Sequence, residues 1–165
     1  MFIYDAYYLF MQEEIARALL ERKWWIATAE SCTGGLLAHT LTNIPGSSAY
    51  FKGGVVSYSN EVKMKVLGVK RETLEQYGAV SEQTAREMAE GVKNLMEVDV
   101  AVATTGIAGP GGGTPEKPVG LVYIGLATPE GVEVKRFLFN GDRLYNKEQF
   151  CNAALNMVLE YLGND

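Results

Sequence analysis

The first segment that could do chemistry is residues 29–35, Ala-Glu-Ser-Cys-Thr-Gly-Gly. It follows a short apolar run at 24–28, which we expect to form a buried strand, and it precedes an expected helix over 36–41. A serine at the start of a helix lies close to backbone N–H groups that stabilise a developing oxyanion, so Ser31 is a candidate nucleophile. The structural alternative is that Ser31 caps the helix and the two glycines form a turn.

The neighbouring Cys32 is an alternative nucleophile. A catalytic cysteine is usually activated by a histidine base, and His39 is the only histidine in the chain. For a hydroxyl nucleophile without a well-placed histidine, a desolvated lysine is the known substitute as base. Lys63 follows an expected strand over 55–59 and lies in the first turn of a helix opening at Asn60. The dipole of that helix should lower the pKa of the amine. The alternative is a solvated surface charge.

A third segment is the glycine-rich stretch 106–115, which follows an expected central strand over 99–104. Its backbone N–H groups could cradle a phosphate, and Lys117 could add charge. It is neither a Walker A loop, because no Gly-Lys-Ser/Thr follows, nor a dinucleotide fingerprint, because the next element is a strand. A flexible surface connection is the alternative, but α/β folds usually bind ligands where such strands end.

Periodic patterns elsewhere in the chain define the elements that must position these residues. Helices are expected over 4–22, 36–41, 60–67, 73–77, 81–96 and from 142 onward, and strands over 24–28, 55–59, 99–104, 121–127 and 132–139. The last two strands are expected to form a hairpin. This mixed order predicts an α/β layered fold with an antiparallel edge rather than a doubly wound parallel sheet.

Composition limits the class of protein. The chain has 165 residues, 47% apolar and 21% charged, which predicts one globular domain over 1–165. A net charge of −5 argues against a nucleic-acid partner, and the lack of an apolar run of about 18 residues argues against a membrane span. Two cysteines and one histidine offer no disulfide framework and no metal-ligand spacing, so we expect no metal, no cofactor and a cytoplasmic location.

Taken together, the motifs resemble one family, the CinA C-terminal domain or nicotinamide-nucleotide amidase family. The resemblance extends in family order over about residues 8 to 162 of the sequence. The matching stretches are 29–35, 45–49 (Pro-Gly-Ser-Ser-Ala), 58–63 (Tyr-Ser-Asn-Glu-Val-Lys), 78–81 (Gly-Ala-Val-Ser), 106–110 (Gly-Ile-Ala-Gly-Pro), 115–120 (Pro-Glu-Lys-Pro-Val-Gly) and 141–143 (Gly-Asp-Arg).

The resemblance implies hydrolysis of the carboxamide of nicotinamide mononucleotide by a metal-independent serine amidase. Ser31 would be the nucleophile, Lys63 the general base and Tyr58 a supporting residue. A three-layer α/β/α sandwich with a mixed sheet is implied, and so is self-association, with a homodimer favoured. Further oxyanion or substrate-binding residues are expected at Cys32, Thr33, Gly34, Gly35, Ser48, Thr105, Gly106, Gly109, Arg143 and Lys147.

Two departures from the family pattern bear on function. Full-length CinA proteins have a larger N-terminal domain that is linked to pyrophosphatase activity. That domain is not expected here, so pyrophosphatase activity is not expected of this chain. Many members carry an arginine where this chain has Lys147, which keeps the charge but loses the bidentate fork. The alternatives to an enzyme are a non-catalytic module that senses the nucleotide, and a competence or DNA-repair accessory factor, against which the negative net charge counts.

Aromatic residues are concentrated near the N-terminus, at Phe2, Tyr4, Tyr7, Tyr8 and Phe10. A surface helix does not need so many, so they are expected either to pack on the core or to line a dimer contact. Packing on the core is the favoured interpretation.

Overall fold

The computed structural model describes the backbone of residues 3–163 and the side chains from residue 6 to residue 163. Its centre is a five-stranded sheet in the order β2-β1-β3-β4-β5. The strands are β1 (Ile26–Glu30), β2 (Phe51–Val56), β3 (Val100–Gly106), β4 (Leu121–Thr128) and β5 (Gly131–Leu138). β1 pairs in parallel with β2 and β3, and β4 and β5 continue the sheet in antiparallel pairing. The expected mixed sheet, central third strand and terminal hairpin are confirmed.

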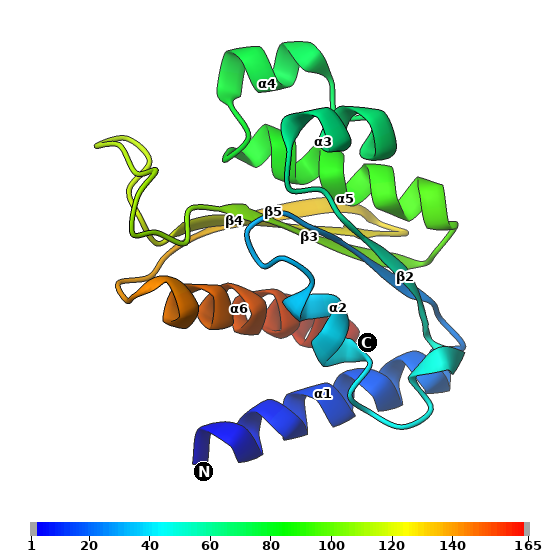
Figure 1. Ribbon diagram of the computed structural model, residues 1–165. Helices are drawn as coiled ribbons and strands as arrows, with labels where there is room; N and C mark the ends of the chain where they lie inside the picture. Colours follow the sequence, from blue (N-terminus) through cyan, green and yellow to red (C-terminus); the bar gives the residue numbers. More distant parts are fainter. Residues whose placement is uncertain (1–2, 164–165) are drawn as a thin grey trace.

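Helices cover both faces of this sheet, which confirms the three-layer α/β/α sandwich (Figure 1). One layer contains α1 (Ile3–Arg22), α2 (Leu36–Leu41) and α6 (Arg143–Gly163), and the other contains α3 (Asn60–Leu67), α4 (Arg71–Tyr77) and α5 (Glu82–Met96). A short 3-10 helix, η1 (Ser47–Ala49), precedes β2. Among the described residues, no helix has the length and apolar character required to cross a membrane.

The two faces of β3 explain how the layers pack. Val100 and Val102 point into the core beneath α1 and α6, whereas Ala101 and Ala103 face α5. Small side chains on the second face allow α5 to lie close to the sheet, so close that a Cβ added at Gly125 would lie 2.6 Å from the carbonyl oxygen of Ala85. The alanines of β3 and the neighbouring Gly125 of β4 together allow the helix to pack at short range.

The bounds of the first two strands differ from the expectation. β1 begins at Ile26 rather than at residue 24, because Lys23 adopts a left-handed φ of +58° that ends α1, and Trp24 N donates to Leu19 O at 3.0 Å. β2 covers Phe51–Val56 rather than 55–59. The two glycines in its middle, at 53 and 54, disfavour a strand by propensity. A Cβ at Gly54 would overlap the buried Thr28 side chain, so the pairing itself requires a glycine there.

The N-terminal aromatics divide between core and surface. Tyr8 packs against the core and shares a hydrogen bond of 2.9 Å with Thr40 Oγ1. Tyr7 and Phe10 are 54% and 52% exposed, so the expected packing on the core holds for Tyr8 and is wrong for these two. Phe2 and the side chain of Tyr4 lie outside the described residues.

A close helix contact in the second layer gives a prediction about stability. A Cβ added at Gly91 of α5 would overlap the carbonyl group of Leu67, the last residue of α3. We expect Gly91→Ala to destabilise the fold by about 1–3 kcal/mol through overpacking. Gly163→Ala is the matched control, because a Cβ at that helical glycine meets nothing within 4 Å. Urea denaturation of both variants measures the difference, and equal midpoints would contradict the close contact.

Candidate active site

The candidate site is a cavity of about 290 Å³ where the three parallel strands end. Ser31 directly follows β1, the segment that leads to Lys63 follows β2, and Gly106 is the last residue of β3. This is the edge at which open α/β sheets bind ligands. The cavity is lined by Ser31, Cys32, Tyr58, Asn60, Lys63, Ala79, Val80, Thr105, Gly106, Ile107, Ala108, Gly109, Gly111, Gly112 and Arg143.

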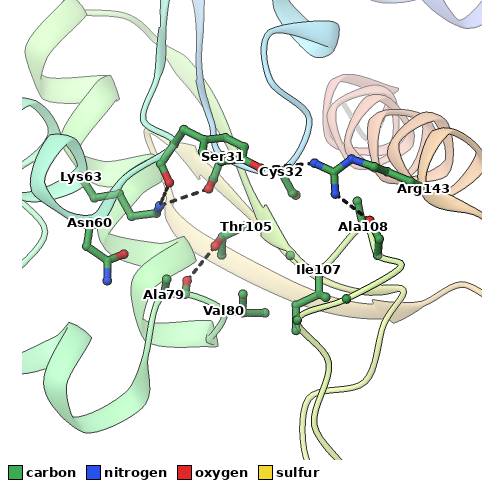
Figure 2. A pocket seen from close by; sticks show the side chains of 15 residues that line it. Ser31, Cys32, Asn60, Lys63, Ala79, Val80, Thr105, Ile107, Ala108 and Arg143 are labelled. Atoms are coloured by element: carbon green, nitrogen blue, oxygen red, sulfur yellow. Dashed lines mark hydrogen bonds between the residues drawn. The ribbon is translucent and has the colours of Figure 1, made fainter.

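Two residues proposed as the reacting pair meet in this cavity (Figure 2). Lys63 Nζ lies 3.1 Å from Ser31 Oγ. The backbone N–H of Ser31 donates to Thr104 O at 3.0 Å, which fixes the serine to the end of the central strand. A nucleophile and a base at hydrogen-bond distance are the geometry that hydroxyl activation requires.

The Lys63 amine is held in place by the chain around it. Its helix is capped at the N-terminus by Ser59, whose hydroxyl accepts from Val62 N at 3.2 Å. Lys63 is only 1% exposed, and its Nζ donates to Ser57 O at 2.9 Å and to Tyr58 O at 3.2 Å. Burial lowers the pKa of this amine, because it penalises the charged form.

Cys32 faces the same cavity but is a poor nucleophile. Burial raises the pKa of its thiol to about 12, so the thiolate form is scarce at neutral pH. The only histidine, His39, lies in α2 and is not among the residues lining the cavity. The alternative of a cysteine–histidine pair is therefore not supported by the geometry.

A buried carboxylate, not foreseen from the sequence, organises the turn that carries Ser31. Glu30 is 1% exposed and accepts hydrogen bonds from Thr33 Oγ1 at 2.6 Å, Leu37 N at 2.8 Å and Ala38 N at 3.0 Å. The N–H groups in the first turn of α2 are thus occupied, which corrects the expectation that they would hold an oxyanion. The backbone N–H of Cys32, which directly follows Ser31 and lines the cavity, donates to no backbone carbonyl among the described residues.

The opposite wall of the cavity is built from the first turn of α6. Arg143 donates from Nη1 to Gly109 O at 2.6 Å and from Nη2 to Tyr58 Oη at 3.3 Å. The fully buried Asn146 ties the same turn to the glycine loop, because its Nδ2 donates to Ala108 O at 3.0 Å and to Gly141 O at 2.9 Å. Asn146 was missed by sequence reasoning, since nothing local marks a helical asparagine as buried.

Charge is unevenly distributed in this cavity. Lys63 and Arg143 are the lysine and arginine side chains that line it, and none of the aspartates and glutamates whose side chains are described does. Since the lysine is buried with a lowered pKa, the arginine is the fixed positive charge. The cavity thus suits an anionic ligand. Within the described chain, no group of three or more histidine, cysteine, aspartate or glutamate residues is placed to hold a metal.

Several residues expected in the site lie outside the cavity. Ser48 is in η1 and precedes β2, so it lies toward the amino end of that strand, whereas the cavity is at the carboxyl end. Lys117 donates from Nζ to Tyr77 O at 2.5 Å, rather than facing a ligand. Lys147 lies over the turn beside Gly34, since its Nζ would be 3.7 Å from a Cβ there.

The turn residues expected to bind substrate have structural roles in the described chain. Gly34 and Gly35 adopt left-handed φ values of +61° and +103°, which the tight turn before α2 requires. Thr33 is buried between Glu30 and Thr104, with its Oγ1 2.8 Å from that of Thr104. None of these three lines the cavity. The other expected residues, Cys32, Tyr58, Thr105, Gly106, Gly109 and Arg143, do line it together with Ser31 and Lys63.

A three-layer α/β/α domain with a buried serine–lysine pair where its parallel strands end is the class that fold and site define. The chain belongs to the CinA C-terminal domain family, whose model matches residues 9–162. It is 57% identical over 157 residues to a CinA-like protein from Chloroherpeton thalassium, an alignment that covers 93% of this chain. The chain spans about 37% of the length of that relative.

Solved structures of related proteins have the same fold. The competence damage-inducible protein A from Klebsiella pneumoniae superimposes with a TM-score of 0.90 at 40% identity, covering 93% of this chain and 96% of that one. The competence/damage inducible protein CihA from Agrobacterium tumefaciens gives a TM-score of 0.87 at 42% identity, covering 93% and 96%.

Proposed function

We propose that this domain is an amidase that hydrolyses the carboxamide of nicotinamide mononucleotide to nicotinate mononucleotide and ammonia. The observation that carries the proposal is the buried Lys63 amine, 3.1 Å from Ser31 Oγ, in a cavity with Arg143 on its other wall. The family resemblance supplies the substrate, and the arrangement of nucleophile, base and cation is suited to it.

The proposed activation of Ser31 follows from the hydrogen bonds of Lys63. A neutral lysine amine has two N–H groups and one lone pair. The carbonyl groups of Ser57 and Tyr58 accept the two N–H groups, so the lone pair is left to face Ser31 Oγ and accept its proton. The lowered pKa of Lys63 favours this neutral form.

The reaction then proceeds in two balanced halves. Ser31 Oγ bonds to the carboxamide carbon as its proton passes to Lys63, and the oxyanion lies near the N–H of Cys32. The C–N bond breaks as Lys63 returns the proton to the nitrogen, releasing ammonia and leaving an ester on Ser31. Water next gives a proton to Lys63 and attacks the ester, whose C–O bond breaks as Ser31 recovers the proton. The acid product then ionises to the carboxylate.

The anionic end of the nucleotide is proposed to bind at Arg143 and the glycine loop. Replacing Arg143 by glutamine should raise KM about 10-fold with a smaller change in kcat, because a charge-assisted contact to the phosphate is lost away from the reacting atoms. Arg143→Lys should recover only part of the affinity, since it lacks the planar fork. Arg136→Gln, at an exposed arginine on β5, is the matched control because it removes the same charge outside the cavity. Steady-state kinetics of both variants separate the loss of a contact in the site from the change in net charge. An unchanged KM would place the phosphate elsewhere.

Ammonia release from nicotinamide mononucleotide by the purified protein is the direct test of the function. We expect turnover and formation of nicotinate mononucleotide. Binding of the nucleotide without ammonia would instead identify a sensing module. A homodimer also stays a proposal, supported by the exposed apolar side chains of Tyr7, Leu9 and Phe10 on α1, and light scattering of the purified chain tests it.

A further inference from the structure

Asn60 lines the cavity and has no place in the mechanism described so far. It is the first residue of α3, and Lys63 follows one turn later, so both side chains lie on the same face of that helix. Figure 2 shows the Asn60 amide beside Lys63, between that residue and Ala79, with Arg143 across the cavity. The Asn60 amide forms no hydrogen bond with another described residue. An amide left open to a ligand cavity has both a donor and an acceptor to offer.

We propose that Asn60 is a specificity-determining residue that binds the NH₂ group of the scissile carboxamide through its Oδ1 atom. This inference rests on the proposed function. In the first half of that reaction Lys63 must return a proton to the leaving nitrogen, so the nitrogen lies on the Lys63 side of the carboxamide carbon. Asn60 is an uncharged polar side chain that lines the cavity next to Lys63.

The chemistry of an asparagine at this point distinguishes substrate from product. A primary carboxamide has N–H groups that Asn60 Oδ1 can accept, whereas the carboxylate product has only oxygens. The product would therefore place an oxygen against an oxygen acceptor unless the Asn60 amide turned over. A site built to accept a substrate N–H rejects an analogue that lacks it, because the acceptor is left unpaired. Asn60 would thus favour binding of the carboxamide and release of the carboxylate.

Binding measured without turnover tests this directly. In the Ser31→Ala background, calorimetry with nicotinamide mononucleotide and with nicotinate mononucleotide should give tighter binding of the carboxamide by about 10-fold. Adding Asn60→Ala should remove most of that preference. Asn43→Ala is the matched control, an exposed asparagine in the connection after α2, and it should leave the preference unchanged. A preference that persists in the Asn60→Ala protein would overturn the inference.

The conservative variant separates recognition from a merely structural role. Asn60→Asp keeps an oxygen acceptor, so relative to Asn60→Ala it should restore binding of the carboxamide and weaken binding of the carboxylate further. Its charge beside Lys63 should also favour the protonated amine and move the rise of kcat to higher pH. An Asn60→Asp protein that behaves like Asn60→Ala in both measurements would contradict the role of Oδ1.

The outcomes for Asn60 and for the proposed function are distinguishable. If the wild-type protein releases ammonia from the nucleotide while Asn60→Ala keeps the full preference for the carboxamide, only the assignment of Asn60 fails. If the wild-type protein releases no ammonia, the proposed function fails, and the assignment of Asn60 fails with it.

Discussion

Replacing Ser31 by alanine is expected to reduce ammonia release from nicotinamide mononucleotide by at least ~10³-fold, because the covalent step loses its nucleophile. The side chain removed is small and 9% exposed, so the fold should persist. Circular dichroism and binding of the nucleotide check that the variant is folded and still forms the cavity. The comparison of initial rates at saturating nucleotide measures the loss in kcat.

The matched control for this prediction is Ser48→Ala. The structure places Ser48 toward the other end of the sheet, so its removal should leave kcat and KM within about 2-fold of wild type, as for most surface substitutions. Substantial turnover by Ser31→Ala would show that another group attacks the carboxamide. Cys32 would then be the first to test, despite the pKa of about 12 that burial gives its thiol.

The second large effect concerns Lys63 and pH. If the neutral amine is the base, kcat should rise with pH through a pKa below the ordinary 10.5 and then level off, because burial lowers the pKa of this amine. Lys63→Met should lose at least ~10²-fold in rate at every pH. Lys63→Arg, which cannot become neutral, should be equally inactive. A wild-type rate that does not change from pH 6 to pH 10.5 would be incompatible with this role.

The same amine should make stability depend on pH in a known direction. Its pKa is lower in the folded chain than in the unfolded chain, so between the two values the unfolded state binds more protons. The free energy of unfolding of the wild type, relative to that of Lys63→Met, should therefore increase as pH rises from the lowered pKa toward 10.5. Urea denaturation of both proteins across this window measures it, and a difference that shrinks with rising pH would reverse the assignment.

The proposed reacting pair could be chosen from the sequence because its signals are local. A serine between a strand and a helix, and a lysine early in the next helix, each have a chemical reason to act that depends on a few neighbours. The identities of Ser31 and Lys63 as candidates followed from those neighbours. The 3.1 Å separation between Lys63 Nζ and Ser31 Oγ could not be predicted in this way. It depends on the parallel pairing of β1 with β2, which no local pattern in the sequence indicates.

The residues that were missed or misplaced depend on contacts made across the fold. Glu30 reads as a charged residue ending a strand, yet its carboxylate is buried against the first turn of α2. Asn146 is buried only because the loop after β3 and the turn before α6 come together around it. Ser48 could have been excluded, because it precedes its strand and ligands bind where parallel strands end.

The residues that line the cavity come from two separate parts of the sequence, and this separation suggests how such domains could change their substrates. The proposed nucleophile and base are residues 31 and 63, whereas the glycine loop and the arginine proposed to bind the anionic end of the ligand are residues 106–112 and 143. Under the proposed function, exchange of the C-terminal portion between relatives would alter how the anionic end of the ligand is bound, while Ser31, Lys63 and Asn60 at the carboxamide would stay in place. For an amidase of the proposed kind, recombination in this region would be a route to substrates with a different anionic group.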